Sequence, residues 1–124
     1  MPMRALIVDD SRYMRRVLRG MLEREGFECD EADDASAGLE LLYSEPEFDL
    51  ALVDWNMPGL SGLEMVKMIR AQDFGGVKVM MVTSHCHTDG IRQALEAGAD
   101  EYLMKPFDGE SLREKLALMG LGAA

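Results

Sequence analysis

Four short apolar stretches of this chain each end in charged or hydroxyl side chains. The stretch ALIV is followed by Asp9 and Asp10, LALV by Asp54, VMMV by Thr83, and YLM by Lys105. Continuous apolar runs of this length are typical of the strands of a parallel sheet, whose carboxyl ends meet at one edge. We therefore expect these five side chains to lie close together, although they are far apart in the sequence.

The types of these side chains indicate what chemistry they could perform. Three carboxylates without histidine or thiol partners suit a hard cation, and a few protein ligands with open positions suit Mg²⁺. The ion, the ammonium group of Lys105 and the hydroxyl of Thr83 would surround the carboxylate of Asp54 with groups that stabilise negative charge. In that arrangement Asp54 could act as a nucleophile toward a phosphoryl group and form an aspartyl-phosphate.

Each of these residues also has a purely structural interpretation. Asp10 and Ser11 could cap the helix that follows them, where an acidic side chain is favourable. Asp54 could be the polar start of a loop, and Lys105 a solvated surface residue. These interpretations account for the residues one at a time, but they leave the coincidence of all of them at strand ends unexplained.

Hydrophobic periodicity divides the chain into five strand-like and five helix-like stretches that alternate. The expected strands are Ala5–Asp9, Phe27–Ala32, Asp49–Asp54, Val77–Val82 and Asp100–Met104, of which the second has the alternation of an edge strand. The expected helix caps are Ser11, Asp34, Ser61, Thr88 and Asp108. The helical spacing also predicts that Tyr43 and Leu95 face the core.

This alternation predicts an α/β fold with a five-stranded parallel sheet and helices on both faces. Right-handed crossovers favour an open, doubly wound sheet, and five units are too few for an eightfold barrel. In the flavodoxin-like order 2-1-3-4-5 the first and third strands are neighbours, which would bring Asp9, Asp10 and Asp54 together. No linker or repeat interrupts the chain, so residues 1–124 are expected to form one domain.

Composition excludes several classes of partner. The formal net charge of −10 and the sequence pI near 4.5 argue against non-specific binding to nucleic acid or to anionic membranes. The apolar runs are too short to span a bilayer, and the N-terminus lacks the features of a signal peptide, so a cytoplasmic location is expected. Cys29 lacks a CxxC partner. The run His85-Cys86-His87 has no accompanying ligands, so a solvated loop is favoured there over a metal or redox site.

The motifs VDD, VDWNMPGLSG, MVTS and YLMKPF, in this order, resemble those of receiver domains of two-component response regulators. The resemblance runs from Arg4 to about Leu118 and so covers nearly the whole chain. The tract DWNMPG, the triplet MRR after the acids and EKL in the last helix are most similar to the stand-alone chemotaxis type, called CheY-like.

The resemblance implies a role for each acidic residue. Asp54 would be the phosphoacceptor. Asp9 and Asp10 would hold Mg²⁺, with Asp10 and Asp54 as direct ligands and Asp9 acting largely through water. The main-chain carbonyl of Asn56 would be a further ligand.

The resemblance also implies a conformational switch. The hydroxyl of Thr83 would move to bond the phosphoryl group, and Lys105 would pair with the phosphoryl oxygens. The bond between Lys105 and Pro106 is expected to be cis. Tyr102 occupies the position of an aromatic ring that turns inward as the threonine moves, so phosphorylation would bias an equilibrium between two packings.

Partners follow from the same resemblance. Such domains take the phosphoryl group from a histidine kinase, speed their own dephosphorylation and are not otherwise enzymes. Their output surface corresponds here to roughly Thr88–Met119, and the chain is expected to be a monomer that binds neither nucleic acid nor membrane. Three possible outputs stay open: a flagellar motor switch, a kinase, or a phosphotransferase, the last including a phosphorelay intermediate or phosphate sink.

Two other classes of protein share some of these features but lack others that they require. Phosphatases with an aspartate nucleophile also use Mg²⁺, but they need a second acid two residues after the nucleophile for proton transfer, and here that residue is Asn56. A flavodoxin-like cofactor binder needs a phosphate-binding loop after the first strand, where this chain has the acidic VDDSRYM.

Overall fold

The fold alternates strands and helices along the chain, as predicted. The computed structural model describes residues 2–45, 47–72, 76–84 and 88–122, and the His85-Cys86-His87 run lies outside these residues. No helix within the described segments has the length and apolarity needed to cross a membrane. The elements are β1 (Met3–Val8), α1 (Arg12–Arg24), β2 (Phe27–Ala32), α2 (Ala35–Ser44), β3 (Leu50–Asp54), α3 (Gly62–Gln72), β4 (Lys78–Thr83), α4 (Thr88–Ala97), β5 (Glu101–Met104) and α5 (Gly109–Leu118).

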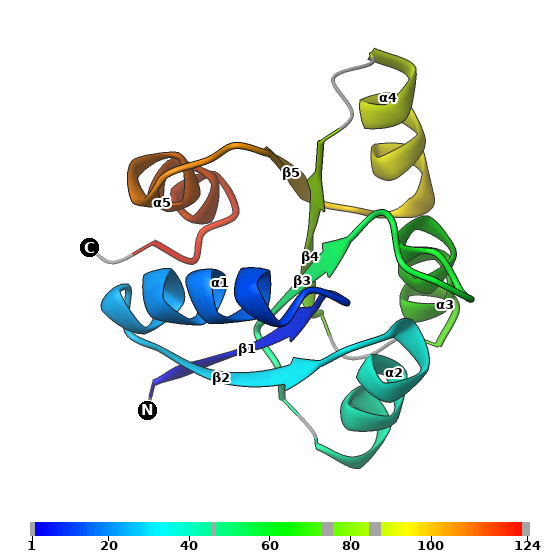
Figure 1. Ribbon diagram of the computed structural model, residues 1–124, viewed down its shortest axis with the longest axis horizontal. Helices are drawn as coiled ribbons and strands as arrows, with labels where there is room; N and C mark the ends of the chain where they lie inside the picture. The colour runs from blue at the N-terminus through cyan, green and yellow to red at the C-terminus, as the bar shows by residue number, and fades with distance from the viewer. Residues whose placement is uncertain (1, 46, 73–75, 85–87, 123–124) are drawn as a thin grey trace.

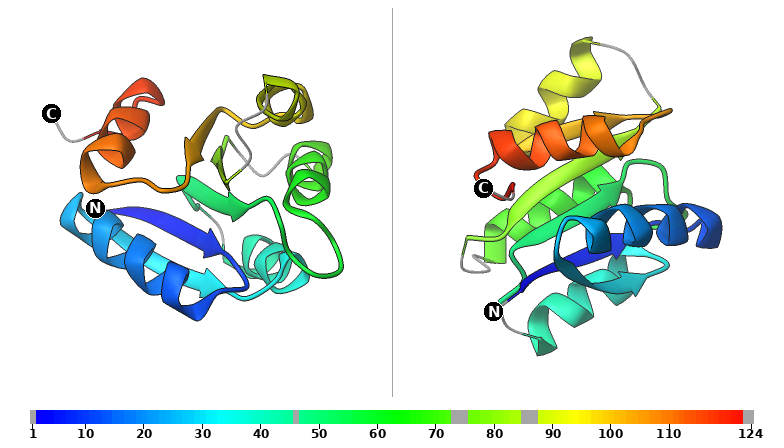
Figure 2. Two further views of the ribbon diagram at one scale, coloured as in Figure 1. Left: turned by 45° about the horizontal axis from the view of Figure 1, so that its top comes forward. Right: turned by 90° about the vertical axis from the view of Figure 1, so that its left-hand side faces the viewer.

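The strands form one parallel sheet in the order β2-β1-β3-β4-β5, which confirms the predicted flavodoxin-like topology. The strand β2 lies at an edge of the sheet, also as predicted. Helices α1 and α5 cover one face, and α2, α3 and α4 cover the other (Figure 1). The view onto the α1 and α5 side in Figure 2 shows both helices lying over the sheet.

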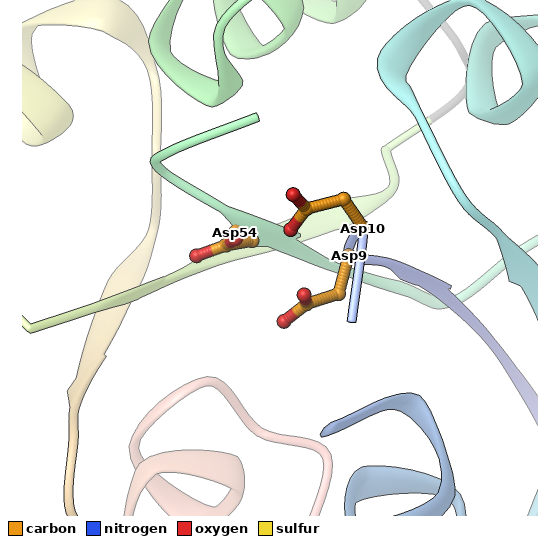
Figure 3. Close-up of side chains that lie close together, drawn as sticks. All are labelled: Asp9, Asp10 and Asp54. Atoms are coloured by element: carbon orange, nitrogen blue, oxygen red, sulfur yellow. The ribbon is translucent and has the colours of Figure 1, made fainter. Parts of the chain in front are cut away.

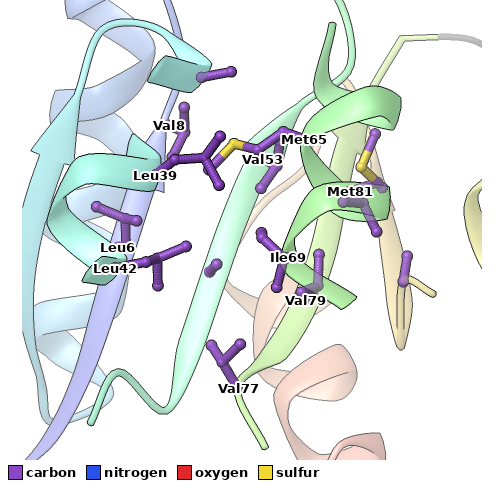
Figure 4. Close-up of a cluster of buried hydrophobic side chains, with 14 of the residues drawn as sticks. Leu6, Val8, Leu39, Leu42, Val53, Met65, Ile69, Val77, Val79 and Met81 are labelled. Carbon is purple, nitrogen blue, oxygen red and sulfur yellow. The ribbon is translucent and has the colours of Figure 1, made fainter. Parts of the chain in front are cut away.

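Alternation along the central strands divides the core into two hydrophobic clusters. Leu6 and Val8 of β1 point into the cluster beneath α2, α3 and α4, whereas Ala5 and Ile7 point into the cluster beneath α1 and α5. Figure 4 shows the first cluster, in which Met65 and Ile69 of α3 pack against the strands. Because the central strands are buried on both faces, they read as continuous apolar runs in the sequence.

Four of the predicted helix caps are found in the structure. The side chains of Ser11, Asp34 and Asp108 each accept a hydrogen bond from the backbone N–H three residues further on. Ser61 and Glu64 form a reciprocal capping box, with backbone-to-side-chain distances of 3.3 and 3.2 Å. Helix α4 begins at Thr88 itself, so Thr88 is the first residue of the helix and not the residue before it, as the predicted cap would require.

Two side chains predicted to face the core are exposed instead. Tyr43 of α2 is 61% exposed and Leu95 of α4 is 48% exposed. Each directly follows a buried residue, Leu42 and Ala94 respectively, and a single step along a helix rotates a side chain by about 100°. Both predictions were wrong because each helix buries a face that is narrower than its series of consecutive apolar residues.

Candidate functional site

Three carboxylates meet where β1 and β3 end side by side. Asp9 and Asp10 directly follow β1, and Asp54 is the last residue of β3. Each side chain offers an oxygen, and these oxygens all lie within 4.8 Å of one another (Figure 3). The predicted convergence of these acids is therefore what the structure shows.

Asp9 is held by hydrogen bonds to its backbone and to one carboxylate oxygen, whereas its other carboxylate oxygen accepts none from the described residues. Its backbone N–H donates to the carbonyl of Ala32 (3.1 Å), and its Oδ1 accepts from the N–H of Ser11 (2.9 Å). Its Oδ2 is buried, and nothing in the described part of the chain donates a hydrogen bond to it. A buried carboxylate oxygen without a donor is costly, so this atom has the character of a ligand for a cation.

Lys105 supplies positive charge from the neighbouring side of the cluster. Its Nζ lies 3.4 Å from Asp54 Oδ1 and 3.9 Å from Asp9 Oδ2. The peptide bond between Lys105 and Pro106 is cis, as predicted. One ammonium group faces three carboxylates, so the site keeps an excess of negative charge and its donor set fits a hard divalent cation such as Mg²⁺.

The two buried carboxyl groups titrate abnormally for physical reasons. Burial raises the pKa of Asp9, the Ser11 N–H and Lys105 lower it in part, and Asp10 raises it further. Burial also raises the pKa of Asp54, followed by repulsion from Asp9, while Lys105 opposes the rise. The dominant cause of the raised pKa is the same in both residues. Burial removes the ionised oxygens from water, and the positive charge beside them is not enough to compensate.

The remaining predicted site residues lie around the same edge of the sheet. Thr83 is the buried last residue of β4, and its carbonyl accepts a hydrogen bond from the N–H of Lys105 (2.8 Å). Asn56 is exposed in the loop after β3. Tyr102 of β5 is half-buried, and the ammonium group of Lys115 lies 4.1 Å from the centre of its ring.

Gly62 supports the site through a close backbone contact that no sequence pattern predicts. It is the first residue of α3, and its N–H donates to the carbonyl of Trp55 (3.0 Å). A Cβ atom at this position would lie only 2.1 Å from the carbonyl oxygen of Asp54. The loop after Asp54 therefore closes so tightly that only glycine fits without moving the backbone. The capping-box spacing located this helix start but could not reveal the close approach.

Comparison with known proteins assigns the chain to a family. The model of the response regulator receiver domain matches residues 5–117. The chain belongs to the response regulator receiver family. Its members act as switches in two-component signalling, and both Mg²⁺ and phosphorylation are typical of them.

Relatives extend over almost the whole receiver domain. The chemotaxis protein CheY of Pseudomonas aeruginosa is 40% identical over 116 residues, covering 92% of this chain and 93% of that protein. A CheY-like receiver domain from Methanospirillum hungatei superimposes with a TM-score of 0.87 at 34% identity, covering 98% of this chain and 97% of that one. A Burkholderia pseudomallei response regulator, solved with a phosphorylated aspartic acid, a calcium ion and citrate, gives a TM-score of 0.82 at 27% identity and covers 92% of this chain and 66% of that one.

Mg²⁺ is expected to raise the melting temperature of this receiver domain, because it would neutralise Asp9, Asp10 and Asp54. At ten times its dissociation constant, a ligand of the folded state stabilises it by about 1.4 kcal/mol. For a domain of this size that corresponds to roughly 5 °C. Thermal melts with and without the ion measure the shift, with NaCl of equal ionic strength as the control. A melting temperature that responds equally to NaCl and MgCl₂, or to neither, would contradict a specific site.

Proposed function

We propose that this receiver domain, spanning residues 1–124, accepts a phosphoryl group from a histidine kinase on Asp54 and thereby switches its affinity for a partner protein. The observation that carries the proposal is the cluster at the ends of β1 and β3. It places a nearly buried carboxylate, two further acids and an ammonium group within reach of one another.

Mg²⁺ is the proposed cofactor. Asp9, Asp10 and Asp54 would hold it, together with the main-chain carbonyl of Asn56. When bound, the ion supplies positive charge that neutralises the carboxylates and stabilises the oxygens of a transferring phosphoryl group. The phosphorylated aspartic acid and calcium ion of the Burkholderia pseudomallei relative support this combination of an acidic acceptor with a divalent cation.

The protein side chains have distinct tasks in the proposed transfer. An oxygen of Asp54 attacks the phosphorus of a phosphohistidine; the new bond is P–O, the P–N bond breaks, and its electron pair returns to the imidazole nitrogen. Lys105, 3.4 Å from Asp54 Oδ1, is placed to pair with a phosphoryl oxygen. Burial of Asp54 limits competition from water around the reacting oxygen.

The proposed output is a change of packing at α4, β5 and α5. Thr83 lies at the end of β4 beside β5, which carries Tyr102, so a hydroxyl that moves toward a phosphoryl group would change the space beside that ring. The chemotaxis proteins among the relatives favour a chemotaxis partner, such as a flagellar motor switch or a phosphotransferase.

Phosphorylation by a small-molecule donor tests the proposal. Incubation with acetyl phosphate and Mg²⁺ is expected to add the mass of one phosphoryl group to the intact protein, and Asp54→Asn is expected to prevent it. Asp33→Asn is the matched control, because Asp33 is an exposed acid that follows β2 at the same edge of the sheet. A phosphoryl group that still appears in Asp54→Asn, or never appears in the wild type, would refute the assignment.

A further inference from the structure

Arg15 of α1 contacts the backbone of the acidic site from outside the cluster. Its Nη1 donates to the main-chain carbonyl of Asp9 at 2.7 Å. The N–H of Asp9 is bonded to Ala32 and its Oδ1 to Ser11, so every polar atom of Asp9 except Oδ2 has a hydrogen-bond partner. Arg15 provides the only side chain among these three partners, because Ala32 and Ser11 use their backbone groups.

Arg15 is itself held in place by the edge strand. Its Nε donates to Oε1 of Glu31 in β2 at 3.1 Å, and its side chain is only 15% exposed. The other oxygen of Glu31 accepts from Nε of Arg19 at 2.5 Å. The planar guanidinium group of Arg15 thus bridges an anchored carboxylate on one side and the carbonyl of Asp9 on the other.

We propose that Arg15 is a positioning residue for the metal site. Anchored by Glu31, it fixes the backbone of Asp9 so that Oδ2, which accepts no hydrogen bond within the described part of the chain, would face the ion. This inference rests on the Mg²⁺ site of the proposed function. Residues that orient a metal ligand contribute to the affinity for the metal, and their loss typically costs about 10-fold or more in binding.

Orientation rather than charge is the proposed mode of action. Arg15 contacts a carbonyl of Asp9, whereas the carboxylate faces the Ser11 N–H and the ammonium group of Lys105. A lysine at position 15 would keep the positive charge but could not bridge the carbonyl and Glu31 with one planar group. If Arg15 acted through its charge, Arg15→Lys would bind Mg²⁺ like the wild type. If Arg15 acts through its geometry, Arg15→Lys is expected to bind the ion more weakly.

The chain offers a matched control in Arg19. Both arginines pair with Glu31 and both lie on α1, but only Arg15 is bonded to Asp9. Calorimetric titration with MgCl₂ is expected to show roughly 10-fold weaker binding for Arg15→Gln and a similar loss for Arg15→Lys. Arg19→Gln loses the ion pairs of Arg19 with Glu31 and Glu23 but no contact with Asp9, so it is expected to bind Mg²⁺ within about twofold of the wild type.

A second readout needs no metal. In Mg²⁺-free protein the Ser11 amide is expected to exchange with solvent faster in Arg15→Gln than in the wild type, because its acceptor, Asp9 Oδ1, is no longer fixed. Arg19→Gln is expected to leave this exchange unchanged. Wild-type Mg²⁺ binding in Arg15→Gln or Arg15→Lys, or an equal loss in Arg19→Gln, overturns the proposal. Should the wild type bind no Mg²⁺ while the exchange of Ser11 still responds to Arg15 alone, the proposed function fails and the positioning of Asp9 stands.

Discussion

Replacing Gly62 with alanine is expected to lower the free energy of unfolding by about 3 kcal/mol, at the upper end of the usual cost of overpacking. The added Cβ would lie 2.1 Å from the carbonyl oxygen of Asp54 and 2.9 Å from both the carbonyl carbon of Asp54 and the Cα of Trp55. All three atoms belong to the backbone, so no side chain can rotate away to make room. The start of α3 and the end of β3 would have to separate.

The same substitution is expected to impair phosphorylation in the protein that remains folded. Moving the backbone of Asp54 moves its carboxylate relative to Lys105, which now lies 3.4 Å away. A misplacement of about 1 Å can cost on the order of 100-fold in rate when a reaction depends on positioned groups. The rate of mass gain with acetyl phosphate, measured at a temperature where the variant is folded, reports this effect separately from stability.

Gly20 provides the matched control for Gly62. It also lies in a helix, α1, but the nearest heavy atom to a Cβ built there is Nη2 of Arg24, at 4.0 Å. Gly20→Ala is therefore expected to stabilise the protein by about 0.5–1 kcal/mol through helix propensity alone. Urea unfolding measures both variants. If Gly62→Ala is as stable as Gly20→Ala, the close approach to Asp54 is not a real constraint.

Most of the fold follows from patterns that are local in the sequence. The buried central strands are apolar on both faces, the edge strand β2 alternates, and four helix starts carry capping residues that the structure confirms. Because parallel strands share one carboxyl edge, these local patterns are enough to predict that Asp9, Asp10 and Asp54 lie close together, as they do in the structure.

The supporting residues of the site could not be predicted in this way. Arg15 and Arg16 are adjacent residues of α1. Arg15 is half-buried against Asp9 and Glu31, whereas Arg16 is exposed. Which of the two reaches the site depends on the rotation of α1 over the sheet. The contact of Gly62 with Asp54 likewise depends on the path of the intervening loop. Such contacts arise from tertiary packing and cannot be predicted from the hydrophobic periodicity of the sequence.

In the absence of Mg²⁺, Asp54→Asn is expected to be more stable than the wild type at neutral pH. Asp54 is only 6% exposed, and its pKa is raised by burial and by the charge of Asp9, so its ionised form is unfavourable in the folded state. An amide of nearly the same shape removes the charge and keeps the volume. We expect the free energy of unfolding to rise by on the order of 1 kcal/mol, the usual size of the effect of a single substitution.

The pH dependence of this difference has a definite sign. Below the ordinary pKa of 3.8 the carboxyl group is protonated in both the folded and unfolded states, so it carries no penalty. Between that value and the raised pKa of the folded state, the folded protein keeps a proton that the unfolded chain has released. The stability of the wild type relative to Asp54→Asn therefore falls as the pH rises through this window, and the difference is constant above it.

Urea unfolding in EDTA, from mildly acidic to neutral pH, measures this difference directly. Asp33→Asn serves again as the control, because a substitution at this exposed position is expected to stay within about 0.5 kcal/mol of the wild type at every pH. Adding Mg²⁺ should stabilise the wild type more than Asp54→Asn and so reduce the gap. A variant less stable than the wild type in EDTA would mean that the ion pair with Lys105 outweighs the burial of Asp54. The cluster would then need no metal to be stable, and the strongest physical argument for Mg²⁺ at this site would be lost.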